Sequence, residues 1–350
     1  MRFYLIVAAL AIGLGGTVAS LFTLERPGML TAQLGFRGVG MEAVVNPRLV
    51  AANAPLHAAP PSLEAADPSG DRASTIYENV PVLGHLSIEQ FGRVMQAMTE
   101  WIYPGEGETQ GCNGCHVPGN FAAEGVYQKT VSRRMLQMVQ MINTQQTAHV
   151  GQTGVTCYTC HRGLAVPAEV WFETPNTATT ALAGQAAGQN RPLPRTGQSS
   201  LPYDTFTPFL LGDAPIRVQD QVARSAPTAA SIQQTEWTYG LMMHMSTGLG
   251  VNCGFCHNSR AWSDWEQSQP QRVVAWHGIR MTRVINTEYI NPLQPNFPPH
   301  RLGPQGDPLK VNCATCHQGV NRPLNGAQML RDYPELNPPG PERRADATPR

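Results

Sequence analysis

One short pattern constrains this chain more than any other: C-x-x-C-H occurs four times. Two thiols three positions apart can bond the two vinyl groups of one porphyrin, and the adjacent histidine can bind its iron. The pattern therefore predicts four covalently bound haem c groups. The motifs are Cys112, Cys115 and His116; Cys157, Cys160 and His161; Cys253, Cys256 and His257; and Cys313, Cys316 and His317.

The number of cysteines restricts the alternatives. A single C-x-x-C can also be a zinc knuckle or a redox-active dithiol. A histidine follows every pair here, which disfavours both readings. The four motifs use all eight cysteines of the chain, so we expect no disulfide, no catalytic thiol and no lipid anchor.

The composition fits a chain whose core is partly cofactor. Hydrophobic residues make up 41% of the 350 residues, but aromatic residues make up only 7%. A chain of this length could form two or three domains, although haem groups would replace side chains in the core. The formal net charge of zero provides no basic surface, so we expect no nucleic-acid partner.

The N-terminus carries an apolar run. Residues 3–24 are uncharged, with Arg2 before them and Glu25 and Arg26 after them. At 1.5 Å per residue such a run can cross a hydrocarbon core of about 30 Å, whereas the apolar part of a signal peptide usually has about 7–15 residues. We predict an uncleaved membrane anchor over residues 1–25, with a cleaved signal near residues 18–20 as the alternative. In both cases the haem domain lies on the periplasmic side of a bacterial inner membrane.

The pattern ahead of each motif predicts a mainly α fold with much irregular loop. Ser87 and Gln90 form a capping-box pattern, and apolar residues then recur at helical spacing over 87–102. Ser231 and Gln234 repeat this pattern ahead of the third motif. Helical spacing also recurs over 131–142 and 274–285, ahead of the second and fourth motifs.

The helix–loop–motif units are duplicated in sequence. RRMLQMVQMINT (133–144) resembles IRMTRVINT (279–287), and TCYTCHRG (156–163) resembles NCATCHQG (312–319). We therefore predict two pseudo-repeated halves, with haem units one and two in 81–172 and units three and four in 231–333. The other predicted regions are an extended arm or free linker (26–80), a connecting segment (173–230) and a disordered tail (334–350).

Each iron needs a ligand beyond its motif histidine if the protein is to carry electrons, and methionine in that position raises the potential. Spacing alone leaves several candidates open for each haem. These are Met95 or Met98 for the first, Met135 or Met138 for the second, Met242, Met243 or Met245 for the third, and Met281 or a distant histidine for the fourth.

Longer stretches of sequence around and between the motifs resemble those of a known family. They include QLGFRG (33–38), SRRMLQM, HVGQTGVTCYTCHRG, LMM (241–243), NCGFCHN, RLGPQG (301–306), CATCHQGV and DYPELNP. Over residues 33–337 the chain resembles the tetrahaem cytochrome subunit of purple-bacterial photosynthetic reaction centres.

The resemblance implies three haems with His/Met ligation and one with His/His ligation. His149, which lies in the second unit, would cross to the fourth haem, and Met281 would be a packing residue. The implied pairs are Met95 with His116, Met135 with His161, Met242 with His257, and His149 with His317.

The resemblance also implies a function. The chain would pass electrons from a soluble periplasmic c-type cytochrome or high-potential iron-sulfur protein to the photo-oxidised bacteriochlorophyll special pair, without acting as an enzyme. Its partners would be the reaction-centre core subunits and the surrounding light-harvesting ring at the intracytoplasmic membrane. The alternative is a periplasmic, membrane-anchored multihaem oxidoreductase, which would need an open iron site.

Two features depart from the family. Many members carry a lipid-anchoring cysteine after the signal peptide, and this chain has none near its N-terminus, which implies an anchor made of protein. The insertion GEGETQG (105–111) also lengthens the loop between Met95 and Cys112.

Overall fold

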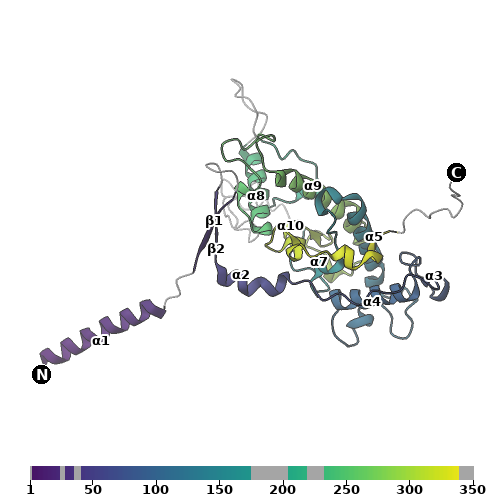
Figure 1. Ribbon diagram of the computed structural model, residues 1–350, viewed down its shortest axis with the longest axis horizontal. Helices are drawn as coiled ribbons and strands as arrows, with labels where there is room; N and C mark the ends of the chain where they lie inside the picture. The colour runs from purple at the N-terminus through teal and green to yellow at the C-terminus, as the bar shows by residue number, and fades with distance from the viewer. Residues whose placement is uncertain (1, 24–27, 35–40, 175–203, 219–231, 339–350) are drawn as a thin grey trace, which may run out of the picture.

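The computed structural model describes residues 2–23, 28–34, 41–174, 204–218 and 232–338. Within these ranges the chain is mostly helical with long irregular loops, as predicted, and helix α1 stands apart from the body that carries the four motifs (Figure 1). The helices of the body are α3 (Ala73–Ile76), α4 (Ile88–Ile102), α5 (Tyr127–Gln145), α6 (Thr147–Val150), α7 (Cys157–His161), α8 (Ile232–Leu249), α9 (Pro270–Val284), α10 (Cys313–His317) and α11 (Met329–Asp332).

Helix α1 (Arg2–Thr23) forms where the apolar run predicts a membrane anchor. None of its residues is buried against the body, and its mean hydropathy reaches 2.2. Among the described residues it is the one helix long and apolar enough to cross a membrane, a test that a signal sequence also passes. An exposed apolar helix of this length is consistent with membrane association.

The predicted arm contains more local structure than its sequence pattern indicates. Strands β1 (Leu30–Leu34) and β2 (Met41–Val45) pair antiparallel, and helix α2 (Pro47–Asn53) follows them. Asn46 caps α2 by accepting a hydrogen bond from the Arg48 amide at 3.0 Å. Further along, the Leu63 amide donates to the Tyr333 hydroxyl at 3.1 Å, so this part of the arm lies on the body and is not a free linker.

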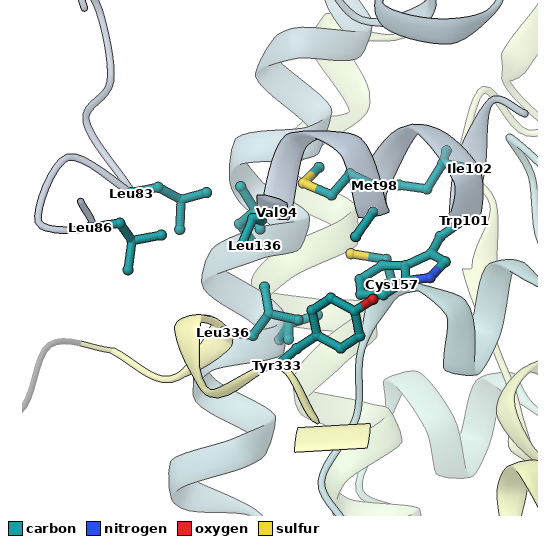
Figure 2. Close-up of a cluster of buried hydrophobic side chains, with 12 residues drawn as sticks. Leu83, Leu86, Val94, Met98, Trp101, Ile102, Leu136, Cys157, Tyr333 and Leu336 are labelled. Carbon is teal, nitrogen blue, oxygen red and sulfur yellow. The ribbon is translucent and has the colours of Figure 1, made fainter. Parts of the chain in front are cut away.

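The first core cluster surrounds α4 and α5. The capping box predicted at Ser87 and Gln90 is present, and α4 buries the face that carries Val94, Met98 and Trp101. Figure 2 shows Tyr333 beside Trp101, and their ring centroids are 4.6 Å apart. Ser231, the cap residue predicted for the third unit, lies outside the described residues.

The C-terminal segment contributes to this cluster, contrary to the prediction of a tail disordered from Pro334 onward. Pro334–Leu336 form a 3₁₀ turn, and Leu336 is only 1% exposed. Leu336 and Tyr333, both in the matching stretch DYPELNP, fill space beside α4 and therefore belong to the core. Residues 339–350 lie outside the described ranges.

Two further clusters hold the second half together and join it to the first. The short strands β3 (Val170–Trp171) and β4 (Lys310–Val311) pair antiparallel, and β3 contributes Trp171 to the second cluster. That cluster contains Trp171, Phe206, Phe209, Leu210, Leu241 and Ile279. The third cluster packs α5 against α9 and the π-helical turn Ile285–Ile290, through Met141, Ile142, Met281, Ile285 and Ile290.

Candidate haem-binding sites

The second and fourth motifs form two short helices with the same local bonds. Ahead of α7 the Thr156 amide donates to Thr159 Oγ1 at 3.0 Å, and ahead of α10 the Asn312 amide donates to Thr315 Oγ1 at 2.9 Å. Each helix ends in a residue with left-handed backbone, which is uncommon outside glycine. These residues are Arg162 and Gln318, both with φ of 50°.

The first and third motifs form 3₁₀ turns with the same local bonds. The His116 amide donates to the Cys112 carbonyl at 3.0 Å, and the His257 amide donates to the Cys253 carbonyl at 2.9 Å. The turns span Gly111–Gly114 and Cys253–Phe255. The four motifs therefore form two matched pairs of loops.

All four motif histidines are oriented in the same way. Each ring contacts a backbone carbonyl through Nδ1, so Nδ1 carries the proton and Nε2 remains available for a metal. The carbonyls and distances are Phe121 at 3.0 Å for His116, Leu164 at 2.8 Å for His161, Trp262 at 3.0 Å for His257, and Val320 at 3.0 Å for His317. This is the usual arrangement of a metal-ligating histidine.

His149 is held in the same manner but by the other half of the chain. Its Nδ1 donates to the Val274 carbonyl of α9 at 2.9 Å, and its ring centroid lies 6.0 Å from that of His317. Two metal–nitrogen bonds of about 2 Å, with about half a ring on each side, also add up to roughly 6 Å. The two imidazoles are thus spaced to accept one iron between them.

Burial keeps this pair neutral. Burial, with a smaller contribution from His149, lowers the pKa of His317 to about 4. Burial likewise lowers the pKa of His149. A neutral imidazole is the form that binds a metal, so the electrostatics of the pair suit ligation.

A cavity of about 990 Å³ lies where the two halves meet. Its volume is at the upper end of the range for cofactor sites, about 300–1,000 Å³. His149, His161 and His317 line it, together with the cysteines of the second and fourth motifs. The candidate ligands Met135 and Met138 line it, as do Met98, Met245 and Met281, whereas Met95 and Met242 do not.

The thiols at these sites lie in apolar surroundings. Burial raises the pKa of the Cys157 and Cys313 thiols to about 12 and that of Cys256 to about 11. Redox-active C-x-x-C dithiols have a lowered thiol pKa instead. These sites therefore suit an apolar macrocycle better than dithiol chemistry.

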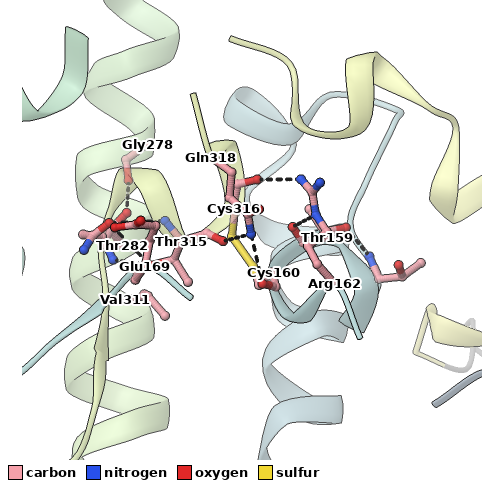
Figure 3. The surroundings of a disulfide bond; sticks show 12 residues. Thr159, Cys160, Arg162, Glu169, Gly278, Thr282, Val311, Thr315, Cys316 and Gln318 are labelled. Carbon is pink, nitrogen blue, oxygen red and sulfur yellow. Dashed lines mark hydrogen bonds between the residues drawn. A yellow bond between two sulfur atoms is a disulfide. The ribbon is translucent and has the colours of Figure 1, made fainter. Parts of the chain in front are cut away.

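The structure corrects one expectation about the cysteines, because Cys160 and Cys316 are joined by a disulfide (Figure 3). The sequence had suggested that no cysteine is left for one. The two residues are 156 positions apart, but α7 and α10 contact each other and bring their Cα atoms to 4.4 Å, which a disulfide can span. Across this contact Arg162 donates to the Cys316 carbonyl at 3.2 Å and Gln318 to the Cys160 carbonyl at 3.5 Å.

Sequence reasoning missed the two asparagines that brace the second and fourth loops. Asn143 donates to the Val155 carbonyl at 3.1 Å and accepts from its amide at 2.8 Å. Asn286 makes the same two bonds to Val311, at 3.0 and 2.9 Å. The signal was present in the repeated word INT, which places both asparagines at corresponding positions.

Comparison with known proteins decides the family. Residues 25–337 match the family described as photosynthetic reaction centre cytochrome C subunit. The chain belongs to this family. The photosynthetic reaction center cytochrome c subunit of Rubrivivax gelatinosus is 48% identical over 316 residues, covering 90% of this chain and 85% of that protein. The corresponding subunit of Thermochromatium tepidum is 49% identical over 321 residues, covering 91% and 78%.

A third relative extends the same match. The reaction center cytochrome c subunit of Roseobacter denitrificans is 41% identical over 277 residues, covering 75% of this chain and 73% of its own length. The resemblance found in the sequence is therefore confirmed. As a cytochrome c subunit of this family, the chain is an electron-transfer protein that binds haem c covalently.

Proposed function

We propose that the chain holds four haems and relays electrons from a soluble periplasmic donor to the photo-oxidised special pair of a reaction centre. The observation that supports this best is the common orientation of the four motif histidines, each with Nδ1 on a backbone carbonyl. Four equivalent ligands in one body suit a relay. The haem groups themselves supply the redox chemistry.

The bonds around the loops support a duplicated body with corresponding positions. The Gly163 amide donates to the Trp101 carbonyl at 2.9 Å, and the Gly319 amide donates to the Gly248 carbonyl at 2.7 Å. Trp101 of α4 thus corresponds to Gly248 of α8. Six residues earlier in each helix stand Met95 and Met242, and three residues earlier stand Met98 and Met245.

This correspondence supports Met95 and Met242 as ligands of the first and third haems. Met98 and Met245 both line the cavity between the halves, where the second and fourth motifs meet. Met95 and Met242 are only partly buried and do not line that cavity. Of the two corresponding pairs of methionines, Met95 and Met242 therefore remain for the motifs at His116 and His257.

The second and fourth haems would share the central cavity. His161 and Met135 would ligate the second, and His317 and His149 the fourth. Because thioether formation adds an S–H across a vinyl double bond, Cys160 and Cys316 must be thiols when haem is attached. In the loaded protein each would carry a thioether in place of the disulfide. Three Met-ligated haems should have higher potentials than the one with two histidines.

The anchor and the arm would attach the body to its partners. Helix α1 would lie in the inner membrane, with the haem domain on its periplasmic face, next to the reaction-centre core subunits and the light-harvesting ring. The donor would be a small c-type cytochrome or a high-potential iron-sulfur protein. N-terminal sequencing of the purified subunit tests the anchor, since recovery of residues 2–23 is expected.

A flash experiment on native membranes tests the relay. Haem oxidation is followed in the alpha-band region after one light pulse while the ambient potential is stepped. We expect rapid oxidation of a bound haem whose amplitude changes as successive haems become reduced. Absence of any light-induced haem signal in photosynthetic membranes, or titration of two or more high-spin haems, would reject the relay in favour of a multihaem oxidoreductase.

A further inference from the structure

We infer that Gly278 decides which residue ligates the fourth haem, because its missing side chain admits His149 where the other half presents a methionine. The inference deepens the ligand set proposed above and rests on it. It concerns a positioning residue, since glycine has no side chain with which to bind iron.

The two loop-bracing asparagines show which residues of the two halves correspond. Asn143 and Asn286 make the same pair of hydrogen bonds, to Val155 and to Val311. Ile142 and Ile285, directly before them, are buried in the same cluster. Five residues before the asparagines stand Met138 and Met281, and both line the central cavity. The two helices therefore correspond residue by residue over this stretch.

Eight residues before the asparagines the two halves differ. Counting back from Asn143 gives Met135, and counting back from Asn286 gives Gly278. Met135 is the methionine proposed to ligate the second haem, and it lines the cavity. Its counterpart is a glycine within a helix, where glycine is disfavoured relative to other residues. Gly278 does not have a positive φ, so backbone conformation does not explain it.

The close approach of the His149 ring explains why position 278 is a glycine. A Cβ built on Gly278 would lie 2.5 Å from Cε1, 2.8 Å from Nδ1 and 3.1 Å from Nε2 of His149. The imidazole thus lies directly against the bare backbone of α9. Even alanine at position 278 would overlap the ring. The place that a methionine side chain would take in this half is occupied by a histidine from the other half.

The backbone next to Gly278 also orients the ring. The Val274 carbonyl, one helical turn earlier, accepts the Nδ1 proton of His149 at 2.9 Å. The ring is held through this bond with its centroid 6.0 Å from that of His317. Gly278 supplies the room and Val274 the hydrogen bond, so together they place His149 opposite the motif histidine. Changing the ligand from methionine to histidine lowers the potential of that one haem.

Gly278→Ala in the full haem-loaded subunit is the first test. We expect one haem of four to lose the bis-histidine signal in electron paramagnetic resonance and to shift its midpoint potential in a redox titration. Gly240→Ala is the matched control, because its new Cβ would lie 2.3 Å from Thr205 Cγ2 and its three nearest atoms all belong to Thr205, which is not a proposed ligand. Gly92→Ala, which meets nothing within 4 Å, is the neutral control. Both controls should keep all four haem signals.

A second test is independent of how well Gly278→Ala folds. His149→Ala should convert one haem to the high-spin form. In that background Gly278→Met should restore a low-spin haem with the sulfur-to-iron charge-transfer band of His/Met ligation and a potential above that of the unmodified chain. An unchanged bis-histidine signal in Gly278→Ala, or a haem that stays high-spin in the double variant, would overturn the inference.

Different results would exclude the proposed ligand set and the role of Gly278. If the unmodified subunit shows no bis-histidine haem, the proposed ligand set is wrong and the role of Gly278 falls with it. If the unmodified subunit shows one and His149→Ala removes it, the ligand set stands. In that case the Gly278 variants alone decide the inference.

Discussion

The two halves of the body hold the loops of their motifs with the same hydrogen bonds. They differ in the buried ion pairs that attach neighbouring segments of the chain. In the first half Arg93 is buried against Glu335, with Nη1 at 2.9 and 3.0 Å from the two carboxylate oxygens. In the second half Lys310 is fully buried and pairs with Asp307 and with Glu173 at 3.2 Å. The bonds that position the histidines are therefore alike in the two halves, as the proposed duplication requires, whereas the ion pairs that attach neighbouring segments differ.

The partners of each cation identify the segment that it secures. Arg93 also donates to the carbonyls of Leu63 and Asp332, at 2.9 and 2.8 Å, so it joins the arm and the C-terminal segment to α4. Its guanidinium carbon lies 4.1 Å from the centroid of the Tyr333 ring. Lys310 instead joins β4 to the start of the connecting segment through Glu173.

The largest effect is expected from removing the buried cation of the first half. In Arg93→Met the Glu335 carboxylate, 3% exposed, would be left without its partner. Breaking a buried pair in this way costs about 3–5 kcal/mol of the free energy of unfolding. Urea denaturation of the haem-loaded subunit measures it. Lys310→Met should cost less, because Glu173 is 37% exposed and can be solvated, and because Asp307, although only 10% exposed, still accepts from the Glu173 amide at 2.7 Å.

The double variant Arg93→Met/Glu335→Gln provides the control. Without its charge the buried side chain should recover part of the lost stability. If Arg93→Met alone proves as stable as the parent chain, the pair does not secure the C-terminal segment, and the contrast between the halves disappears.

The next effect concerns the asparagines that the two halves share. Asn286→Ala would remove the acceptor of the Val311 amide and the donor to the Leu210 carbonyl at 3.2 Å, while the Val311 carbonyl would keep the Trp171 indole N–H at 3.0 Å. Each buried group left unsatisfied costs about 1–3 kcal/mol. Asn143→Ala removes bonds to Val155 alone and should cost less. Thermal unfolding of the two variants compares them, and a loss for Asn286→Ala no larger than that for Asn143→Ala would contradict this order.

Replacing either methionine of α4 by leucine should change the free energy of unfolding only slightly, but the two replacements should differ in their effect on the haem spectra. Met98→Leu conserves volume in the core and should cost under about 1.5 kcal/mol while leaving all haem spectra intact. Met95→Leu should instead remove one His/Met signal and leave one haem high-spin. In the second half Met245→Leu should behave like Met98→Leu, and Met242→Leu should behave like Met95→Leu. If Met98→Leu were the variant that lost a haem ligand, the correspondence drawn through Trp101 and Gly248 would be wrong.

The local features of this molecule could be predicted from the sequence. The capping box at Ser87 and Gln90 and the helical spacing that follows depend on residues within one or two turns, and α4 forms as predicted. Residues 3–23 of the apolar run form a helix for the same reason. Motif spacing likewise indicated haem attachment without any knowledge of the fold.

Features that depend on packing could not be predicted in this way. Periodicity left the fourth haem with Met281 or an unspecified histidine, since nothing local to His149 points to a site more than 160 residues away. The proximity of Cys160 to Cys316 depends on how α7 meets α10. The burial of Leu336 depends on the space beside α4, which its Pro-rich neighbourhood does not reveal.

The smallest expected effect tests the start of the first half. Ser87 Oγ accepts from the Gln90 amide at 3.1 Å and donates to the Asp67 carbonyl, so it caps α4 and fastens the arm. Helix α5, by contrast, begins after Val126 without a side-chain cap. Ser87→Ala should cost about 1 kcal/mol of the free energy of unfolding, measured by urea denaturation, whereas Ser87→Thr should retain most of it. Because α5 already forms without a cap, packing of α4 against Leu136 and Tyr333 should keep the helix and the first haem's spectrum intact in Ser87→Ala. A change in that spectrum would mean that the cap, and not the core beneath it, positions Met95.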